Sequence, residues 1–372
     1  MLLKRATPSP TAHRMSSAMK NLRPSRPNGY TIIELMVAIT ISLIVLVALV
    51  TLFARNSGER RAIERTNEQT EDGRYALQLM SDDLRNAGYL ASFNPGTFAA
   101  PNPQLAPPAA LPNPCATDVP TLNSAMVLPV QGYDNGTNAP ACVADLRAGT
   151  DILVVRRAST CAVGTLGCDA QVGGDPYLQA SGCASEFTAV TYYVLDTNVA
   201  NLNLHTKDCV TPAALYQYRT HIYFVANDDQ AGDGIPTLKR AELGFVNGAL
   251  AFTVVPLVEG VENLQIEYGL DTGVPTTGSP VVYTADPNSY PVGVAPACTT
   301  ATCYWGNTVE AKINLLTRDP TPTQGYTDTK VYTLGLTAGG VANTFGPFND
   351  SYRRHVYYTV ARLNNPASRN SP

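Results

Sequence analysis

The chain has 372 residues, of which 44% are hydrophobic, and carries a formal net charge of −4. This length is sufficient for an anchor plus one large domain or two small ones. The first 29 residues contain six basic residues and no acidic residue. The rest of the chain has 20 Lys and Arg against 30 Asp and Glu, a formal net charge of −10. Such an acidic surface argues against direct nucleic-acid binding, because that binding neutralises phosphates with basic side chains.

Directly behind this basic leader, residues 1–29, lies an apolar run of 25 residues from Tyr30 to Ala54. Glu34 is its only charge, and it holds no Pro or Gly. At ~1.5 Å per helical residue the run is long enough to cross the hydrocarbon core of a bilayer. A charge at the centre of such a span costs about 2.5–3.5 kcal/mol, so we expect Glu34 to have a function. The positive-inside rule keeps the leader in the cytoplasm and sends everything after residue 54 across the membrane.

Secretory signals place a small-residue cleavage site after their apolar core, whereas here Gly29 precedes it. The basic leader, Gly29, the aromatic Tyr30 and Glu34 together resemble the N-terminus of type IV prepilins over residues 24–54. The resemblance implies that a prepilin peptidase cleaves between Gly29 and Tyr30 and that Tyr30 becomes N-methylated. Type IV prepilins more commonly have Phe at the position of Tyr30. This difference concerns the expected methylation more than the expected cleavage. The alternative is a plain signal anchor in which Glu34 is incidental.

The helical pattern continues beyond the apolar run, but its composition becomes polar. Apolar and small residues recur at steps of three and four, and charged residues such as Asp82, Asp83 and Arg85 occupy the other faces. We therefore expect one helix from about Tyr30 to Ala87, stopped by Gly88, with an amphipathic part at residues 55–88 that docks on the domain's own sheet. The stripe consists of Ile63, Thr66, Thr70, Gly73, Leu77, Met80, Leu84 and Ala87.

Residues 89–148 contain ten prolines. That density blocks helices and central strands, so we predict an irregular surface region. Residues 149–365 have the alternating pattern of a β-rich periplasmic domain, and 366–372 form a short tail. The expected strands are Ile152–Val155, Phe187–Leu195, Tyr216–Val225, Pro236–Leu243, Ala251–Val255, Leu264–Tyr268, Val309–Leu316, Lys330–Leu336 and His355–Leu363.

An even number of cysteines, eight, lies in the part predicted to be translocated. This pattern predicts disulfides formed in an oxidising periplasm. No C-x-x-C pair typical of a zinc ribbon or a redox site is present. The spacing leaves the connectivity open; we predict sequential pairing of neighbours, most firmly for the last two. The cysteines are Cys115, Cys142, Cys161, Cys168, Cys183, Cys209, Cys298 and Cys303.

No catalytic motif stands out. The four histidines are scattered, and there is no H-E-x-x-H, G-x-S-x-G or P-loop sequence. We predict neither catalytic residues nor a cofactor; a membrane-anchored periplasmic enzyme or binding module is the distant alternative. The densest acidic loop contains Asp228, Asp229 and Asp233, a weak candidate for holding Ca²⁺. Lys239 or Arg240 stands where an EF-hand requires Glu, so we predict a solvated turn without metal.

The C-terminal third carries a second resemblance. The segment Leu257–Asp271, LVEGVENLQIEYGLD, is similar to the LVEGVENLQ…YG.D segment of PilW-family minor pilins. The segments Asp233–Leu238, Val309–Arg318 and Tyr352–Asn365 are also similar to that family. From its residues alone, the segment around Val258 to Tyr268 suits a short helical or irregular entry followed by a half-buried strand.

The two resemblances imply an α+β, type IV pilin-like fold: a long N-terminal helix, transmembrane then amphipathic, followed by a disulfide-bonded, mainly antiparallel β domain. They imply a single-pass inner-membrane prepilin that enters the type IV pilus or primes its assembly and supports twitching motility, adhesion or DNA uptake. On assembly, Glu34 would pair with the N-terminal amine of a mature subunit. The implied partners are other minor pilins, the major pilin, prepilin peptidase, the inner-membrane assembly machinery and a tip adhesin. A J-like pseudopilin of type II secretion is the nearer alternative.

Overall fold

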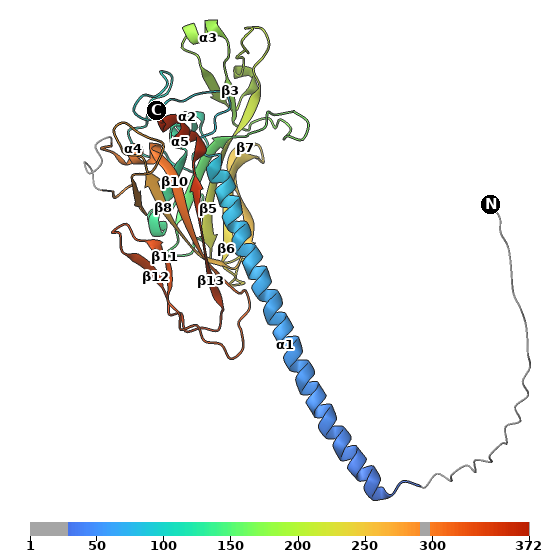
Figure 1. The fold of residues 1–372 in the computed structure, drawn as a ribbon. Helices are drawn as coiled ribbons and strands as arrows, with labels where there is room; N and C mark the ends of the chain where they lie inside the picture. The colour runs from blue at the N-terminus through green and yellow to red at the C-terminus, as the bar shows by residue number, and fades with distance from the viewer. Residues whose placement is uncertain (1–28, 291–297, 372) are drawn as a thin grey trace, which may run out of the picture. The chain divides into compact units, whose positions relative to one another are not determined.

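The computed structural model describes residues 29–290 and 298–371, so the predicted leader lies almost entirely outside the described residues (Figure 1). The chain divides into two compact units at Arg61 and Ala62. The first described element is helix α1 (Ile32–Arg85), 54 residues long. Its ends lie within two residues of those predicted. Gly88 follows with φ +69°, a left-handed conformation that is typical of the residue ending a helix.

The second unit begins within α1 and contains all strands of the described residues. Its larger sheet has seven antiparallel strands, in which the order β1-β2-β5-β3-β4 is extended by β6, paired with β5, and by β7, paired with β6. The bounds are β1 (Val130–Tyr133), β2 (Ile152–Ala158), β3 (Tyr177–Ala180), β4 (Tyr193–Asp196), β5 (Leu215–Ala226), β6 (Thr237–Val246) and β7 (Ala249–Glu259).

A four-stranded antiparallel sheet follows in the order β13-β10-β8-β9. The hairpin of β11 and β12 lies beside it and contacts β8 and β10 (Figure 1). The bounds are β8 (Val261–Leu270), β9 (Val282–Thr284), β10 (Thr308–Arg318), β11 (Tyr332–Leu336), β12 (Ala342–Phe345) and β13 (Arg354–Arg362). Short helices complete the unit: α2 (Val119–Ala125), η1 (Asp134–Gly136), α3 (Ala184–Thr188), η2 (Val199–Asn201), α4 (Ala301–Gly306) and α5 (Asn364–Asn370).

The C-terminal part of α1 packs into the main core of this unit, as its apolar stripe predicts. Met80 and Leu84 are fully buried in a cluster that also takes side chains from β2, β5, β8 and β10. Gly73 meets the ring of Tyr357 on β13 so closely that a Cβ would lie 2.4 Å from a ring carbon. The stripe is not buried throughout, however, because Ile63 remains 62% exposed.

Three local predictions were wrong. Residues 89–148 are not irregular throughout, because they contain α2 and β1; Asp118 caps α2 by accepting a hydrogen bond from the N–H of Thr121. The segment 187–195 begins inside α3 and becomes a strand only at Tyr193. The segment from Val261 has no helical entry: β8 begins there and every one of its residues is buried. The strand is covered on both faces, so alternation alone underestimates its burial.

The fold class is confirmed: a long N-terminal helix precedes antiparallel β-sheets with several disulfides. The eight cysteines pair in chain order, which is the sequential arrangement expected from the sequence. The pairs are Cys115–Cys142, Cys161–Cys168, Cys183–Cys209 and Cys298–Cys303.

Candidate functional site

Glu34, the residue predicted to act in assembly, forms the N-terminal cap of α1 together with Thr31. Its Oε2 accepts the backbone N–H of Thr31 at 3.0 Å and the Thr31 hydroxyl at 3.1 Å, while the N–H of Glu34 donates to Thr31 Oγ1 at 3.2 Å. This reciprocal arrangement is a capping box, which satisfies N–H groups that have no partner within the helix. The T-x-x-E pattern before an apolar run is a known signature of a helix start, so Thr31 and Glu34 mark this cap in the sequence itself.

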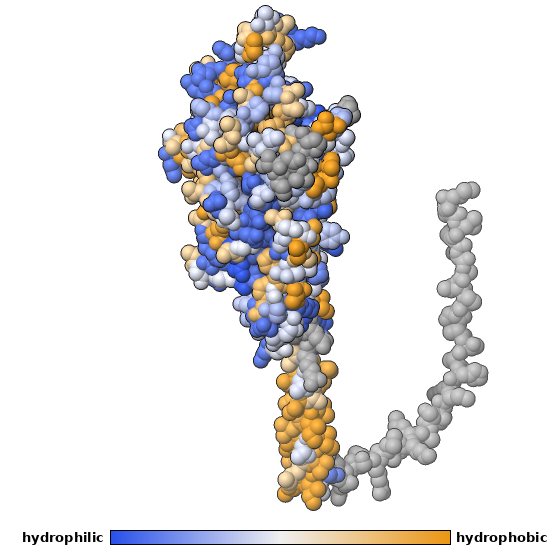
Figure 2. Space-filling view, turned by 90° about the vertical axis from the view of Figure 1, so that its left-hand side faces the viewer, coloured by the Kyte–Doolittle hydropathy of each residue, from blue (hydrophilic) through white to orange (hydrophobic). Residues whose placement is uncertain are grey.

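The helix behind this cap presents mostly apolar side chains to its surroundings. Ile32–Ala54, 23 residues, is long and apolar enough to cross a membrane. Figure 2 shows this part of α1 as an almost continuous hydrophobic surface. Thr40 and Thr51 each donate their hydroxyl to the backbone oxygen three residues earlier, at 2.9 Å. A lipid environment requires such internal partners, because it offers none itself.

A second polar centre holds α1 to the large sheet. Asp83 is buried and accepts hydrogen bonds from Arg157 Nε at 2.6 Å on β2, and from His221 Nδ1 at 2.7 Å and the Tyr223 hydroxyl at 2.9 Å, both on β5. Burial alone would raise the pKa of Asp83, but His221 and Arg157 hold it well below its usual range. The sequence pattern placed Asp83 outside the apolar stripe and gave no sign that its side chain is buried, 5% exposed.

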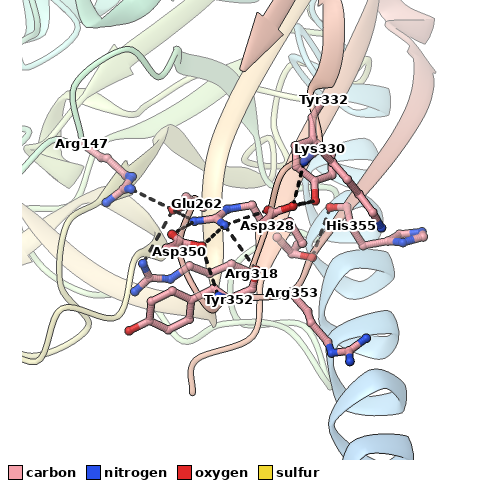
Figure 3. A network of polar contacts seen from close by, with 12 residues as sticks. Arg147, Glu262, Arg318, Asp328, Lys330, Tyr332, Asp350, Tyr352, Arg353 and His355 are labelled. Atoms are coloured by element: carbon pink, nitrogen blue, oxygen red, sulfur yellow. Dashed lines mark hydrogen bonds and ion pairs between the residues drawn. The ribbon is translucent and has the colours of Figure 1, made fainter. Parts of the chain in front are cut away.

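A third polar centre joins segments that resembled the PilW family in sequence (Figure 3). The Arg354 guanidinium on β13 is buried and contacts Glu262 on β8, Asp328 at 3.0 Å and Asp350 at 2.6 Å. Arg147 also binds Glu262, at 3.0 Å. The cluster therefore ties β8, β13 and the long connection between β10 and β13 together.

Arg318, at the end of β10, completes this centre. Its Nη1 lies 3.7 Å from Glu262, and its guanidinium stacks on the Tyr352 ring at 4.2 Å from the centroid. Three arginines thus face three carboxylates, so the charges balance inside the fold. Breaking one pair of such a cluster is costly because a buried charge is then left unpaired. We interpret this centre as a structural fastening of the domain.

The acidic loop predicted as a turn uses its carboxylates on its own backbone. Asp228 accepts the N–H groups of Gly232 and Gly234 at 2.9 and 2.8 Å. Asp233 accepts those of Asp229, Gln230 and Ile235. Within residues 29–290 and 298–371, no three or more His, Cys, Asp or Glu side chains are grouped so that they could hold a metal ion.

The described histidines do not converge on one site. His221 belongs to the Asp83 centre, His205 Nδ1 lies 2.7 Å from Glu186, and the ring of His355 packs against Tyr357 at 4.7 Å between centroids. The described part of the chain thus contains a capped apolar helix and a β domain whose segments are held together by buried ion pairs and disulfides.

Two matches to protein-family models agree with the two sequence resemblances. Residues 222–365 match the family model "Type IV Pilus-assembly protein W", and residues 24–50 match the "Prokaryotic N-terminal methylation motif". Among solved structures, the type IV-like pilin from Thermus thermophilus matches with 15% identity and a TM-score of 0.26, covering 58% of this chain and 78% of that chain. Among curated proteins, none matches the chain.

Proposed function

We propose that this chain, a PilW-type pilus-assembly protein by its residues 222–365 and its N-terminal methylation motif, acts as a minor type IV pilin. It is made as an inner-membrane prepilin with the β domain in the periplasm. Prepilin peptidase cleaves it between Gly29 and Tyr30, and Tyr30 is N-methylated. The mature protein enters the pilus or primes its assembly, and thereby supports twitching motility, adhesion or DNA uptake.

The observation that carries this proposal is the single carboxylate of the apolar helix. Glu34 is the only charge between Tyr30 and Ala54. In the isolated chain, backbone and hydroxyl groups of Thr31 occupy this carboxylate, which lowers the cost of keeping it in a membrane. During assembly, the positive amine of a mature neighbouring subunit takes their place. Two unit charges 4 Å apart attract by roughly 4 kcal/mol at an effective dielectric constant of 20.

This exchange explains how one residue serves two steps. Capping lowers the free-energy cost of placing the Glu34 carboxylate in the membrane. Pairing with an amine occurs only when helices from different subunits lie side by side at the correct axial offset. A lone charge among packed apolar helices is penalised, so the pair selects one register. The β domain then selects which other minor pilins, major pilin or tip adhesin the subunit meets.

The test separates the charge of Glu34 from its role as a cap. Glu34→Gln keeps an oxygen that can accept the Thr31 N–H but removes the charge. Thr31→Val removes the hydroxyl of the cap and keeps the carboxylate. Both variants replace the wild-type chain in its own pilus system, and targeted mass spectrometry measures the amount of protein in the membrane and in sheared pili.

We expect Glu34→Gln to remain in the membrane fraction at the wild-type level and to be lost from pili. Thr31→Val should be incorporated nearly as well as wild type, because a cap contributes only about 1 kcal/mol. Incorporation of Glu34→Gln at the wild-type level would contradict the pairing role. Equal losses for both variants would assign the effect to the helix end rather than to the charge.

A further inference from the structure

Helix α5 carries an arginine that is neutralised by no acidic side chain of the described part of the chain. Arg369 Nε donates to the backbone oxygen of Asn365 at 3.1 Å, and no ion pair forms between Arg369 and a described Asp or Glu. Burial lowers the pKa of Arg369 to about 10. Arg157 and Arg354, by contrast, each bind a buried carboxylate. Arg369 is half-buried, and a partly desolvated guanidinium is stabilised by a carboxylate partner.

Arg369 lines a hollow of about 460 Å³ between the turn that follows α1 and the C-terminal helix α5. The lining residues are 88–95, Asn365, Ser368 and Arg369, and none of them is acidic. Gly88 lies close to the guanidinium, since a Cβ at that position would lie 2.7 Å from Nη2 of Arg369. Both apolar and polar residues line the hollow, from Phe93 and Pro95 to Ser92 and Asn94.

The surrounding backbone offsets only part of the positive charge. α1 ends near this place and α5 begins there: Asn365 Nδ2, in the first turn of α5, donates to the oxygen of Ala87 at 3.1 Å, which ties the end of α1 to the start of α5. The C-terminus of a helix contributes roughly half a negative charge, and short helices contribute less. A carboxylate can add a full charge and accept two parallel hydrogen bonds from the guanidinium.

We propose that this recess binds the carboxylate of an acidic side chain that a neighbouring pilin subunit presents. The inference rests on the proposed function, because assembly supplies such a neighbour. Charge complementarity favours a subunit of this kind: without its leader, this chain itself has 30 acidic against 20 basic residues. Arg369 lies beyond residue 365, where the family match ends, so the match assigns it no role.

The recess can be probed in the full-length chain produced with its own pilus system. A photo-crosslinking amino acid replaces Ser368, which is exposed and lines the hollow. Peptide mapping of the adduct identifies the partner and the contacted segment. We expect a pilin segment that contains Asp or Glu, and a roughly tenfold or larger fall in adduct yield for Arg369→Gln, as for loss of one hydrogen-bonded charge pair.

Arg362→Gln is the matched control, because Arg362 is exposed and also donates to a backbone oxygen, that of Gly278 at 3.2 Å. Its adduct yield should equal that of the unsubstituted crosslinking chain. Arg369→Lys keeps the charge without the two-pronged geometry and should give an intermediate yield. Thermal unfolding of each variant shows whether the domain is folded. If Arg369→Gln does not fold, the adduct yield of Arg369→Lys relative to the unsubstituted crosslinking chain tests the inference instead.

An unchanged yield for Arg369→Gln, or an adduct with a segment that lacks acidic residues, would overturn the inference. Inorganic phosphate added to the wild-type chain tests the other source of an anion. Stabilisation by phosphate that disappears in Arg369→Gln, with no subunit adduct, would make the recess a site for free anions and also overturn it. If Arg369→Gln leaves the adduct intact while Glu34→Gln is lost from pili, this inference fails and the proposed function stands.

Discussion

Replacing Asp83 by Asn removes the charge that fastens α1 to the large sheet. Asp83 faces Arg157, His221 and Tyr223 with all three contacts at 2.9 Å or less. The amide nitrogen would turn a donor toward at least one of these donors and leave Arg157 without its counterion. Removing one partner of a buried ion pair costs about 3–5 kcal/mol. We therefore expect Asp83→Asn to lower the free energy of unfolding by that amount.

The preceding residue provides a matched control. Asp82 pairs with Arg85 at 3.2 Å, but both side chains are more than half exposed. Exposed pairs contribute about 0–1 kcal/mol, so Asp82→Asn should leave stability nearly unchanged. Urea unfolding of the two purified variants, each as the full mature chain in the same detergent, measures the difference. Equal losses for Asp82→Asn and Asp83→Asn would refute the role that we assign to the buried cluster.

The same pair of proteins predicts a pH dependence. Because the folded-state pKa of Asp83 lies below its usual value, its contribution to stability is complete above about pH 4, the ordinary range for Asp. The contribution is lost as the pH falls through the lowered pKa of the folded state. The difference in unfolding free energy between wild type and Asp83→Asn should therefore shrink as the pH falls below about 4. A constant difference down to pH 2 would contradict this explanation.

Further predictions concern the N-terminus, the second ion cluster and the disulfides. Mass spectrometry of the membrane form should find Tyr30, N-methylated, as the first residue; a chain that starts near residue 55 would indicate ordinary signal cleavage. Arg354→Ala should lower the free energy of unfolding by about 3–5 kcal/mol, since Asp328 is then buried without a counterion, whereas the exposed Arg353→Ala should cost about 1 kcal/mol or less. Alkylation without reductant should find all eight cysteines blocked, and reduction should remove roughly 2–4 kcal/mol per disulfide; mostly free thiols would contradict this.

The elements with strong local patterns could be predicted from the sequence. The apolar run and the pattern behind it predicted α1, and alternation located β5 and β10, all to within two residues. Gly88 marked the end of the helix because its conformation favours glycine. These features depend on residues that are close together in the chain, so a single sequence contains the necessary information.

The buried ion pairs could not be predicted, because their partners are distant in the chain. Asp83 lies 74 residues from Arg157 and 138 from His221, and Arg354 lies 92 residues from Glu262. In a helix pattern Asp83 cannot be distinguished from the exposed Asp82. The burial of β8 was underestimated for a related reason: polar residues such as Glu262 and Gln265 usually indicate an exposed face, but here other parts of the fold supply their partners.

We propose that this protein is a minor pilin that enters the type IV pilus or primes its assembly. Counting surface pili by electron microscopy, in a strain that lacks the gene and in the same strain carrying the wild-type gene, tests it most directly. We predict few or no pili without the gene and normal numbers after its return. Equal numbers of pili in both strains would contradict the claim.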